Sequence, residues 1–104
     1  MYNGNLKNER TDRLVAALLS LRDEEECYRL FEDLLTIREV QDLSSRLEVA
    51  ELLRAKATYN DIVARTGVST ATIGRVNRAL NYGAGGYSTV LDRIDETGKE
   101  QPEQ

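Results

Sequence analysis

The chain contains no histidine, one cysteine and one proline among its 104 residues. Without an imidazole there is no His base, no His–metal site and no Ser-His triad. Cys27 falls on an apolar helical face without an obvious base, which favours a packing role over a nucleophile. Gly83, Gly85 and Gly86 follow a predicted helix rather than a strand, and no Lys-Ser/Thr pair follows them, so they do not form a phosphate loop. The sequence therefore predicts neither an enzyme nor a metal or cofactor site.

Helix breakers and long apolar runs are also scarce. The only proline is Pro102, so nearly the whole chain lacks the strongest helix breaker. A lone cysteine excludes an internal disulfide framework and suits a reducing cytoplasm. No apolar run approaches the ~20 residues needed to span a bilayer, and the N-terminus lacks the apolar stretch of a signal peptide. We therefore expect a small all-α protein in the cytoplasm, with no membrane partner.

The charge is unevenly distributed along the chain. The formal net charge of −4 argues against a nucleic-acid partner. Between Arg54 and Leu80, however, five basic residues stand against one acid, Asp61, for a net +4, whereas residues 92–104 carry a net −3. Because the Debye length in physiological salt is ~8 Å, a distant acidic tail does not cancel a local basic surface. The segment from Arg54 to Leu80 is therefore the part of the chain suited to phosphate contact.

Apolar spacing and cap signatures predict a series of short helices. The predicted helices cover residues 11–21, 23–35, 36–43, a fourth that begins at Ser44 or Ser45, 58–67, 69–81 and 88–94. The cap signatures are Asp23 with Glu26, Thr36 with Glu39, Thr58 with Asp61, and Ser69. Residues 82–87 are expected to be irregular because three glycines disfavour a helix there. The domain is predicted to span residues 11–94, between a flexible N-terminus, 1–10, and a disordered acidic tail, 95–104.

Helices 11–21 and 23–35 both carry wide apolar faces. These faces could form a core within one chain, or a core shared between two chains. We favour the shared core because so short a chain of short helices encloses little volume alone. We therefore expect an all-α dimer whose core is shared between two chains.

Residues 59–80 carry the features of a helix-turn-helix. Gly67 stands where the turn needs a positive φ, and Val68 can fold back between the helices. Ile62, Ile73 and Val76 are expected to complete a small core, and Ser69 caps the second helix. The alternative is an αα-hairpin without a nucleic-acid role, or a helix-turn-helix that binds another protein, which the net negative charge would suit.

The outward face of the second helix has small and polar residues suited to the major groove of double-stranded DNA. Thr and Ala methyl groups can touch a thymine methyl, and a Thr hydroxyl can bond a base edge. Basic side chains nearby can neutralise phosphates. The predicted DNA-binding residues are Arg54, Lys56, Tyr59, Asn60, Ser69, Thr70, Ala71, Gly74 and Arg78.

Four segments together resemble the tryptophan repressor family. They are Leu34-Leu35-Thr36, Ser44-Ser45-Arg46, Glu51-Leu52-Leu53-Arg54 and the run from Thr66 to Arg75. The YerC/YecD-type branch of Trp-repressor-like proteins is the most similar. The resemblance spans roughly residues 11–80. It implies an intertwined homodimer that places two recognition helices in successive major grooves, ~34 Å apart.

The resemblance also implies a corepressor pocket at Thr36, Arg46, Thr72 and Arg75. Val76 stands where the family's repressor has a glycine that leaves space for the indole ring, and Ala79 replaces a serine. A branched Val side chain overfills such a site. We therefore expect that DNA binding does not depend on tryptophan, and that Val76 holds the helix-turn-helix in place instead. Arg46 and Arg75 could still hold the carboxylate of another small corepressor, although ion pairs with nearby acids of the same chain are the favoured expectation.

Overall fold

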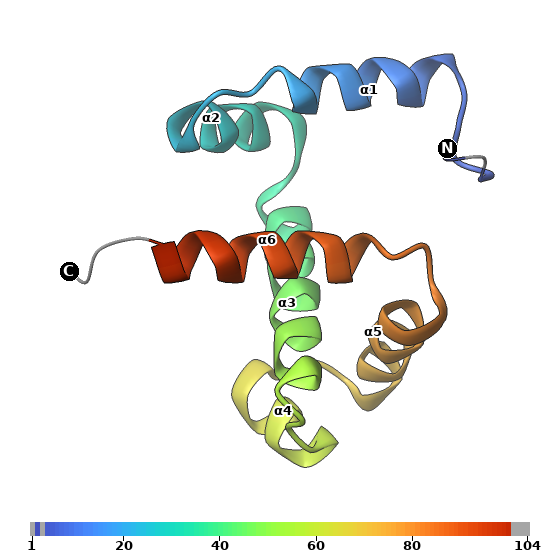
Figure 1. The fold of residues 1–104 in the computed structure, drawn as a ribbon, viewed down its shortest axis with the longest axis vertical. Helices are drawn as coiled ribbons and strands as arrows, with labels where there is room; N and C mark the ends of the chain where they lie inside the picture. Colours follow the sequence, from blue (N-terminus) through green and yellow to red (C-terminus); the bar gives the residue numbers. More distant parts are fainter. Residues whose placement is uncertain (1, 3, 101–104) are drawn as a thin grey trace. The chain divides into compact units, whose positions relative to one another are not determined.

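The computed structural model describes residue 2 and residues 4–100 of the chain (Figure 1). Within these residues it contains six α-helices and no strand, which confirms the all-α prediction. The helices are α1 (Glu9–Leu19), α2 (Glu24–Leu34), α3 (Ile37–Arg54), α4 (Tyr59–Thr66), α5 (Thr70–Tyr82) and α6 (Gly86–Glu100). The chain divides into two compact units, one up to Ile37 and one from Arg38 onward.

The first unit consists of α1 and α2, each opened by a side-chain cap. Asn8 accepts a hydrogen bond from the Thr11 N–H at 2.9 Å. Asp23 accepts one from the Glu26 N–H at 2.9 Å, as its cap signature predicts. No residue of either helix is buried within the chain. By themselves, the two helices of the first unit therefore do not enclose a core.

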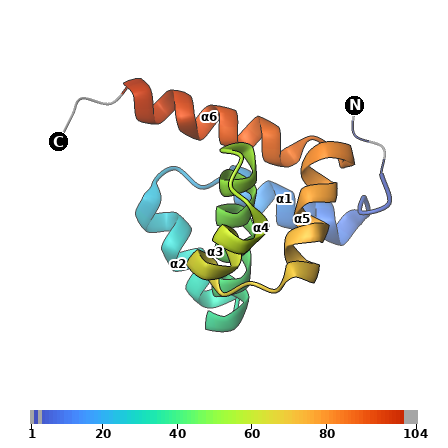
Figure 2. The ribbon, with the colours of Figure 1, turned by 90° about the horizontal axis from the view of Figure 1, so that it is seen from below.

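The second unit has a compact core to which all four of its helices contribute. Its buried residues are Val49 and Ala50 of α3, Ile62 of α4, Ile73 and Val76 of α5, and Leu91 of α6. α4 packs on α5 and α5 on α6, while α6 lies across α3 (Figures 1 and 2). The α4–α5 pair is thus attached to a core that α3 and α6 complete.

The predicted break between residues 43 and 44 is wrong, because α3 is one continuous helix of 18 residues. Ser44 does not cap a new helix. Its hydroxyl donates instead to the Val40 carbonyl at 2.8 Å, one turn earlier. A serine within a helix often bonds back in this way, and no Gly or Pro in the segment interrupts the backbone.

The glycine-rich segment is shorter than predicted. α5 continues through Tyr82 and α6 begins at Gly86, so only residues 83–85 lie outside the two helices. At Gly83 a Cβ would lie 2.4 Å from the Ala79 carbonyl oxygen, and Gly85 has a φ of 87°. Two glycines therefore make the corner, and the third starts a helix.

The ends of the predicted domain also differ from the structure. α1 begins at Glu9, inside the predicted flexible N-terminus of residues 1–10. α6 extends past the predicted end at Ile94 to Glu100, so residues 95–100 of the predicted tail are helical. The predicted disorder of residues 101–104 falls outside the described residues. Of the helices described, none combines the length and apolar composition needed to cross a membrane.

Candidate nucleic-acid interface

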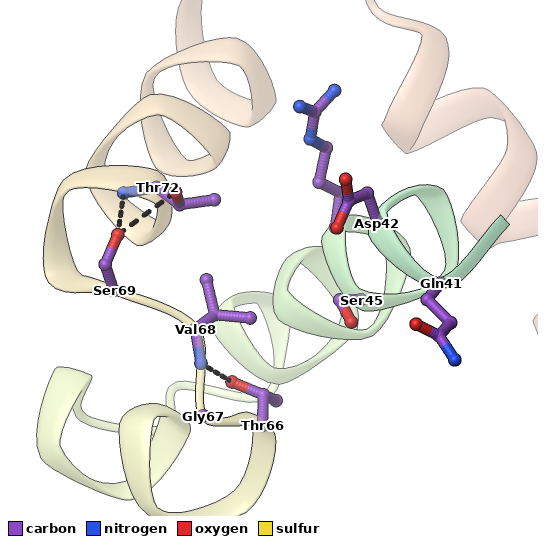
Figure 3. A pocket seen from close by; sticks show the side chains of 9 residues that line it. Gln41, Asp42, Ser45, Thr66, Gly67, Val68, Ser69 and Thr72 are labelled. Atoms are coloured by element: carbon purple, nitrogen blue, oxygen red, sulfur yellow. Dashed lines mark hydrogen bonds between the residues drawn. The ribbon is translucent and has the colours of Figure 1, made fainter. Parts of the chain in front are cut away.

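The turn between α4 and α5 is fixed by four short-range hydrogen bonds. Gly67 has the predicted left-handed conformation, with φ 70°, and its N–H donates to the Val63 carbonyl at 2.9 Å. The Thr66 hydroxyl donates to the Ile62 carbonyl at 2.7 Å and accepts from the Val68 N–H at 3.1 Å. Ser69 then caps α5 by accepting from the Thr72 N–H at 3.2 Å (Figure 3). This chain of contacts makes the helix-turn-helix a rigid bend rather than a loose hairpin.

The small core beneath this bend is the predicted one. Ile62 and Ile73 are fully buried, Val76 is 4% exposed, and Val68 is partly buried against them. At about 25 cal/mol per Å² of buried apolar surface, each such side chain stabilises the fold by roughly 1.5–3 kcal/mol. The core therefore fixes which face of α5 points outward.

The outward face of α5 carries predicted DNA-binding residues. Thr70, Ala71 and Arg78 are exposed, and Gly74 is partly exposed between them. A Cβ built on Gly74 would meet nothing within 4 Å. Close packing among the described residues therefore does not explain why residue 74 is a glycine, although a glycine inside a helix costs about 1 kcal/mol relative to alanine. Gly74 leaves the middle of this face open to the close approach of an external surface.

Tyr59 and Asn60 open α4, after the cap that Thr58 provides to the Asp61 N–H at 3.1 Å. Both are exposed, Tyr59 by 39% of its surface. The predicted contact residues therefore include two from the exposed first turn of the first helix of the motif, together with those on α5.

Lys56 lies two residues after the end of α3 and has an unusual backbone conformation. Its φ is 67°, in the left-handed region that lysine rarely adopts. Its N–H donates to the Leu53 carbonyl and the Ala57 N–H to the Leu52 carbonyl, both at 3.0 Å, as in a Schellman cap. The exposed Lys56 ammonium is thus carried by a fixed corner directly before the helix-turn-helix.

Arg54 differs from the other predicted phosphate contacts because it is already paired. Its guanidinium lies 2.6 Å from the Asp92 carboxylate on α6, and its side chain is only 33% exposed. Asp92 offsets its charge and competes with a phosphate for the same donors. The prediction that Arg54 contacts DNA stays a prediction, and it requires this pair to open.

Two cavities adjoin the motif on its inner side. The first, of about 390 Å³, lies between α3 and the turn that leads into α5 (Figure 3). It is lined mostly by polar residues, among them Asp42, Ser45 and Arg46 of α3 and Thr66, Ser69 and Thr72 of the motif. Ser69 and Thr72 already bond to each other here, with their hydroxyl oxygens 3.1 Å apart.

The second cavity, of about 240 Å³, brings together most of the predicted ligand pocket. Arg46, Thr72, Arg75 and Val76 all line it, and Ala79 completes the α5 side. Thr36 belongs to the first unit, so its predicted place in this pocket stays a prediction. Tyr87 of α6 also lines the cavity, and the sequence analysis missed this residue because it placed residues 82–87 in an irregular segment.

The two arginines of this cavity have no charged partner among the described residues. Neither Arg46 nor Arg75 forms an ion pair or hydrogen bond within the described part of the chain. Within the described residues, no acid neutralises either arginine, which opposes the favoured expectation of ion pairs without testing the acids at residues 96–104. In addition, no group of three or more potential metal ligands occurs among the described residues.

Comparisons with known proteins agree on one family. Residues 9–95 match the family model described as Trp repressor protein. The chain is 54% identical over 100 residues to the uncharacterized protein YerC of Bacillus subtilis (strain 168), with 96% of each chain covered. A TrpR-like protein from Eubacterium eligens matches with a TM-score of 0.83 and 52% identity, over 86% of this chain and 93% of that one. A Trp-repressor-like protein from Staphylococcus aureus matches with a TM-score of 0.82 and 44% identity, over 86% and 90%.

Proposed function

The chain belongs to the Trp repressor family, a family of regulators that are not enzymes, and from this premise we propose that it is a sequence-specific, DNA-binding transcription regulator. The observation that carries the proposal is the orientation of α5. Ser69 caps its N-terminus, the core holds its apolar face, and Thr70, Ala71, Gly74 and Arg78 remain on the outside. A short helix with a small-residue face at its N-terminal half can lie in the major groove.

Phosphate contacts come from residues around this helix. Ser69 at the start of α5 and Tyr59 and Asn60 at the start of α4 offer donors at helix N-termini, where the helix dipole favours a phosphate. Lys56 and Arg78 add full positive charges, and both are exposed. These groups set the register of α5 on the duplex, and the small residues of its outer face read the bases.

We also propose that the working form is a homodimer. The support is the lack of any buried residue in α1 and α2, although Leu14, Val15 and Leu18 lie on one apolar face. Two copies that share this surface would present two α5 helices, and the half-sites are then expected about one DNA turn, ~34 Å, apart.

Tryptophan is not required in this proposal. Val76 is 4% exposed and belongs to the core of the second unit, so its side chain already fills space beside α5. Calorimetry with L-tryptophan is the direct test, and we expect no binding. Titration with small carboxylates tests whether Arg46 and Arg75 accept an effector instead. Binding of one tryptophan per chain would contradict this part of the proposal.

DNA binding itself is tested by selecting duplexes from a random pool and measuring the affinity of the best duplex across a salt series. We expect affinity to fall steeply with salt because phosphate contacts release counterions. The double variant Lys56→Gly/Arg78→Ala should bind more weakly and show a smaller salt slope. Glycine accepts the positive φ of residue 56, so this variant should keep its fold.

The matched control removes an exposed arginine away from the motif. Arg29→Ala in α2 also removes a positive charge, from a side chain that is 74% exposed, and should leave affinity unchanged. If no duplex is selected, or if the double variant binds like the original protein, the proposal is wrong. A partner protein captured by the same face would then be the better explanation.

A further inference from the structure

The cavity between α5 and α6 has an aromatic wall supplied by the chain itself. Tyr87, the second residue of α6, lines this space of about 240 Å³ opposite Val76 and Ala79 of α5. Its side chain is partly buried and packs against the core that contains Val76. Its hydroxyl makes no hydrogen bond to any other described residue, so the contact depends on the ring.

The short connection before Tyr87 restricts where this ring can lie. Only residues 83–85 separate α5 from α6, and a Cβ at Gly83 would collide with the Ala79 carbonyl. Gly85 adopts a φ of 87°, and its carbonyl accepts the Thr89 N–H at 3.1 Å to start α6. The corner therefore turns the chain back so that the first turn of α6 meets the side of α5.

The remaining wall of the cavity is cationic. Arg46 of α3 and Arg75 of α5 both line it, and neither has an acidic partner within the described residues. A phenol ring offers such guanidinium groups an aromatic neighbour without adding a negative charge. The ring lines the cavity with Thr72, Val76 and Ala79 of α5, whereas Thr70 and Arg78 lie on the exposed face of that helix and do not line it.

We propose that Tyr87 is a positioning residue, whose ring packs from the first turn of α6 against the core around Val76 and so holds α5 in its DNA-reading orientation without any added molecule. This inference rests on the proposed function, because α5 is taken to be the reading helix. It extends that function by assigning control of the orientation of α5 to a side chain of the protein itself and not to a bound ligand. Removal of the ring should leave a vacant site, lined by two arginines, that a free phenol or an aromatic carboxylate can enter.

The experiment uses the full chain with Tyr87 replaced by alanine and by phenylalanine. Tyr87→Ala should weaken binding to the selected duplex by about tenfold or more, and hydrogen exchange of the α5 amides should become faster. Millimolar p-cresol, the side chain supplied as a free molecule, should reverse both effects. 4-Hydroxyphenylacetate should act at lower concentration if its carboxylate meets Arg46 and Arg75. Tyr87→Phe should behave like the original protein.

Tyr82→Ala is the matched control, because Tyr82 is the last residue of α5 and is 87% exposed. It should not speed α5 exchange, and p-cresol should have no effect on it. The inference is overturned if Tyr87→Ala leaves α5 exchange unchanged, or if p-cresol restores nothing while Tyr87→Phe is folded. Should Tyr87→Ala be unfolded, recovery of its helical circular dichroism by p-cresol supports the inference, and lack of recovery opposes it.

The exchange and rescue measurements do not involve DNA. If the original protein bound no duplex, the proposed function would fail, while exchange of α5 would still decide whether Tyr87 positions that helix. If DNA bound normally and Tyr87→Ala changed neither readout, the inference would fail and the proposed function would stand.

Discussion

The two units of this chain use apolar residues in different ways. In the second unit, residues from α3, α4, α5 and α6 meet in one core, and Ile62, Ile73 and Val49 are fully buried. In the first unit, α1 and α2 carry apolar faces of similar width but contribute no buried residue. Leu14, Val15 and Leu18 of α1 remain 42%, 46% and 41% exposed.

This difference shows what an amphipathic pattern can and cannot indicate. Regular apolar spacing shows that a helix has a face to bury, but it does not identify the surface that covers it. The second unit has the helices needed to cover its own faces. The first unit does not cover its own faces, and we propose that a second copy of the chain covers them.

The largest effect is expected from the core of the second unit. Ile62→Ala should lower the free energy of unfolding by about 2–5 kcal/mol, because a large buried side chain is lost and a cavity is left. Denaturant unfolding measures this value. Val63→Ala is the matched control, since the neighbouring Val63 is 37% exposed, and it should cost clearly less. Equal losses at both positions would contradict the described core.

The apolar face of α1 gives the next test. If two copies bury it together, Leu18→Ala should cost about 2 kcal/mol or more, and the unfolding midpoint of both the variant and the original protein should fall on dilution because dimer stability depends on concentration. Leu19→Ala is its control, because Leu19 is 80% exposed. A monomeric solution mass, with equal and small effects of the two variants, would remove the proposed shared core.

Gly67 tests the bend that orients the second unit's exposed face. Gly67→Ala should cost about 1–2 kcal/mol, because a Cβ is unfavourable at its φ of 70°. No neighbouring atom lies within 4 Å of that Cβ, so the cost comes from the backbone alone. Gly67→Asn should cost less, since asparagine tolerates this region better. Thermal unfolding of the two variants checks the order, and the reverse order would argue against a backbone cause.

Gly74 should respond in the opposite direction. Gly74→Ala should stabilise the fold by about 0.5–1 kcal/mol, because α5 is helical there and the Cβ meets open space. The same change should weaken DNA binding if the groove approaches the helix at this point. Parallel measurement of melting temperature and DNA affinity separates the two effects. A variant that gains both stability and affinity would show that Gly74 is not a point of close approach.

The smallest stability effect is expected at the pair between Arg54 and Asp92. Asp92→Asn should cost only about 0.2–1 kcal/mol, because such partly exposed ion pairs are weak. It should also release Arg54 and raise DNA affinity at low salt. Asp33→Asn in α2 gives the same change of net charge and should raise affinity less. If both variants have equal affinity, Arg54 makes no phosphate contact.

Local chemistry made much of the second unit predictable. The caps at Thr58 and Ser69, the left-handed Gly67 and the core residues Ile62, Ile73 and Val76 all followed from short-range rules. The continuity of α3 did not, because Ser44 can either cap a helix or bond back to the Val40 carbonyl. Which bond forms depends on the packing of the whole helix, and an isolated serine does not reveal it.

The candidate site likewise combines features that the sequence predicted with features that depend on the tertiary structure. Exposure of Thr70, Ala71 and Arg78 followed from the helical period once the apolar face of α5 was known. The pairing of Arg54 joins residues 38 positions apart, and the place of Tyr87 depends on a corner between two helices. Neither long-range contact leaves a periodic signal in the sequence.

By itself, the sequence determined the all-α class, the caps at Asp23, Thr58 and Ser69, the bend at Gly67 and the family, because each rests on neighbouring residues or on a run of matched ones. The tertiary structure alone decided that α3 is continuous, that Asp92 pairs with Arg54, and that Tyr87 lines the cavity beside Val76. The physical reason is the separation along the chain over which each kind of interaction acts. Backbone hydrogen bonds and caps act over three or four residues, whereas ion pairs and ring packing between helices depend on how the chain folds back on itself.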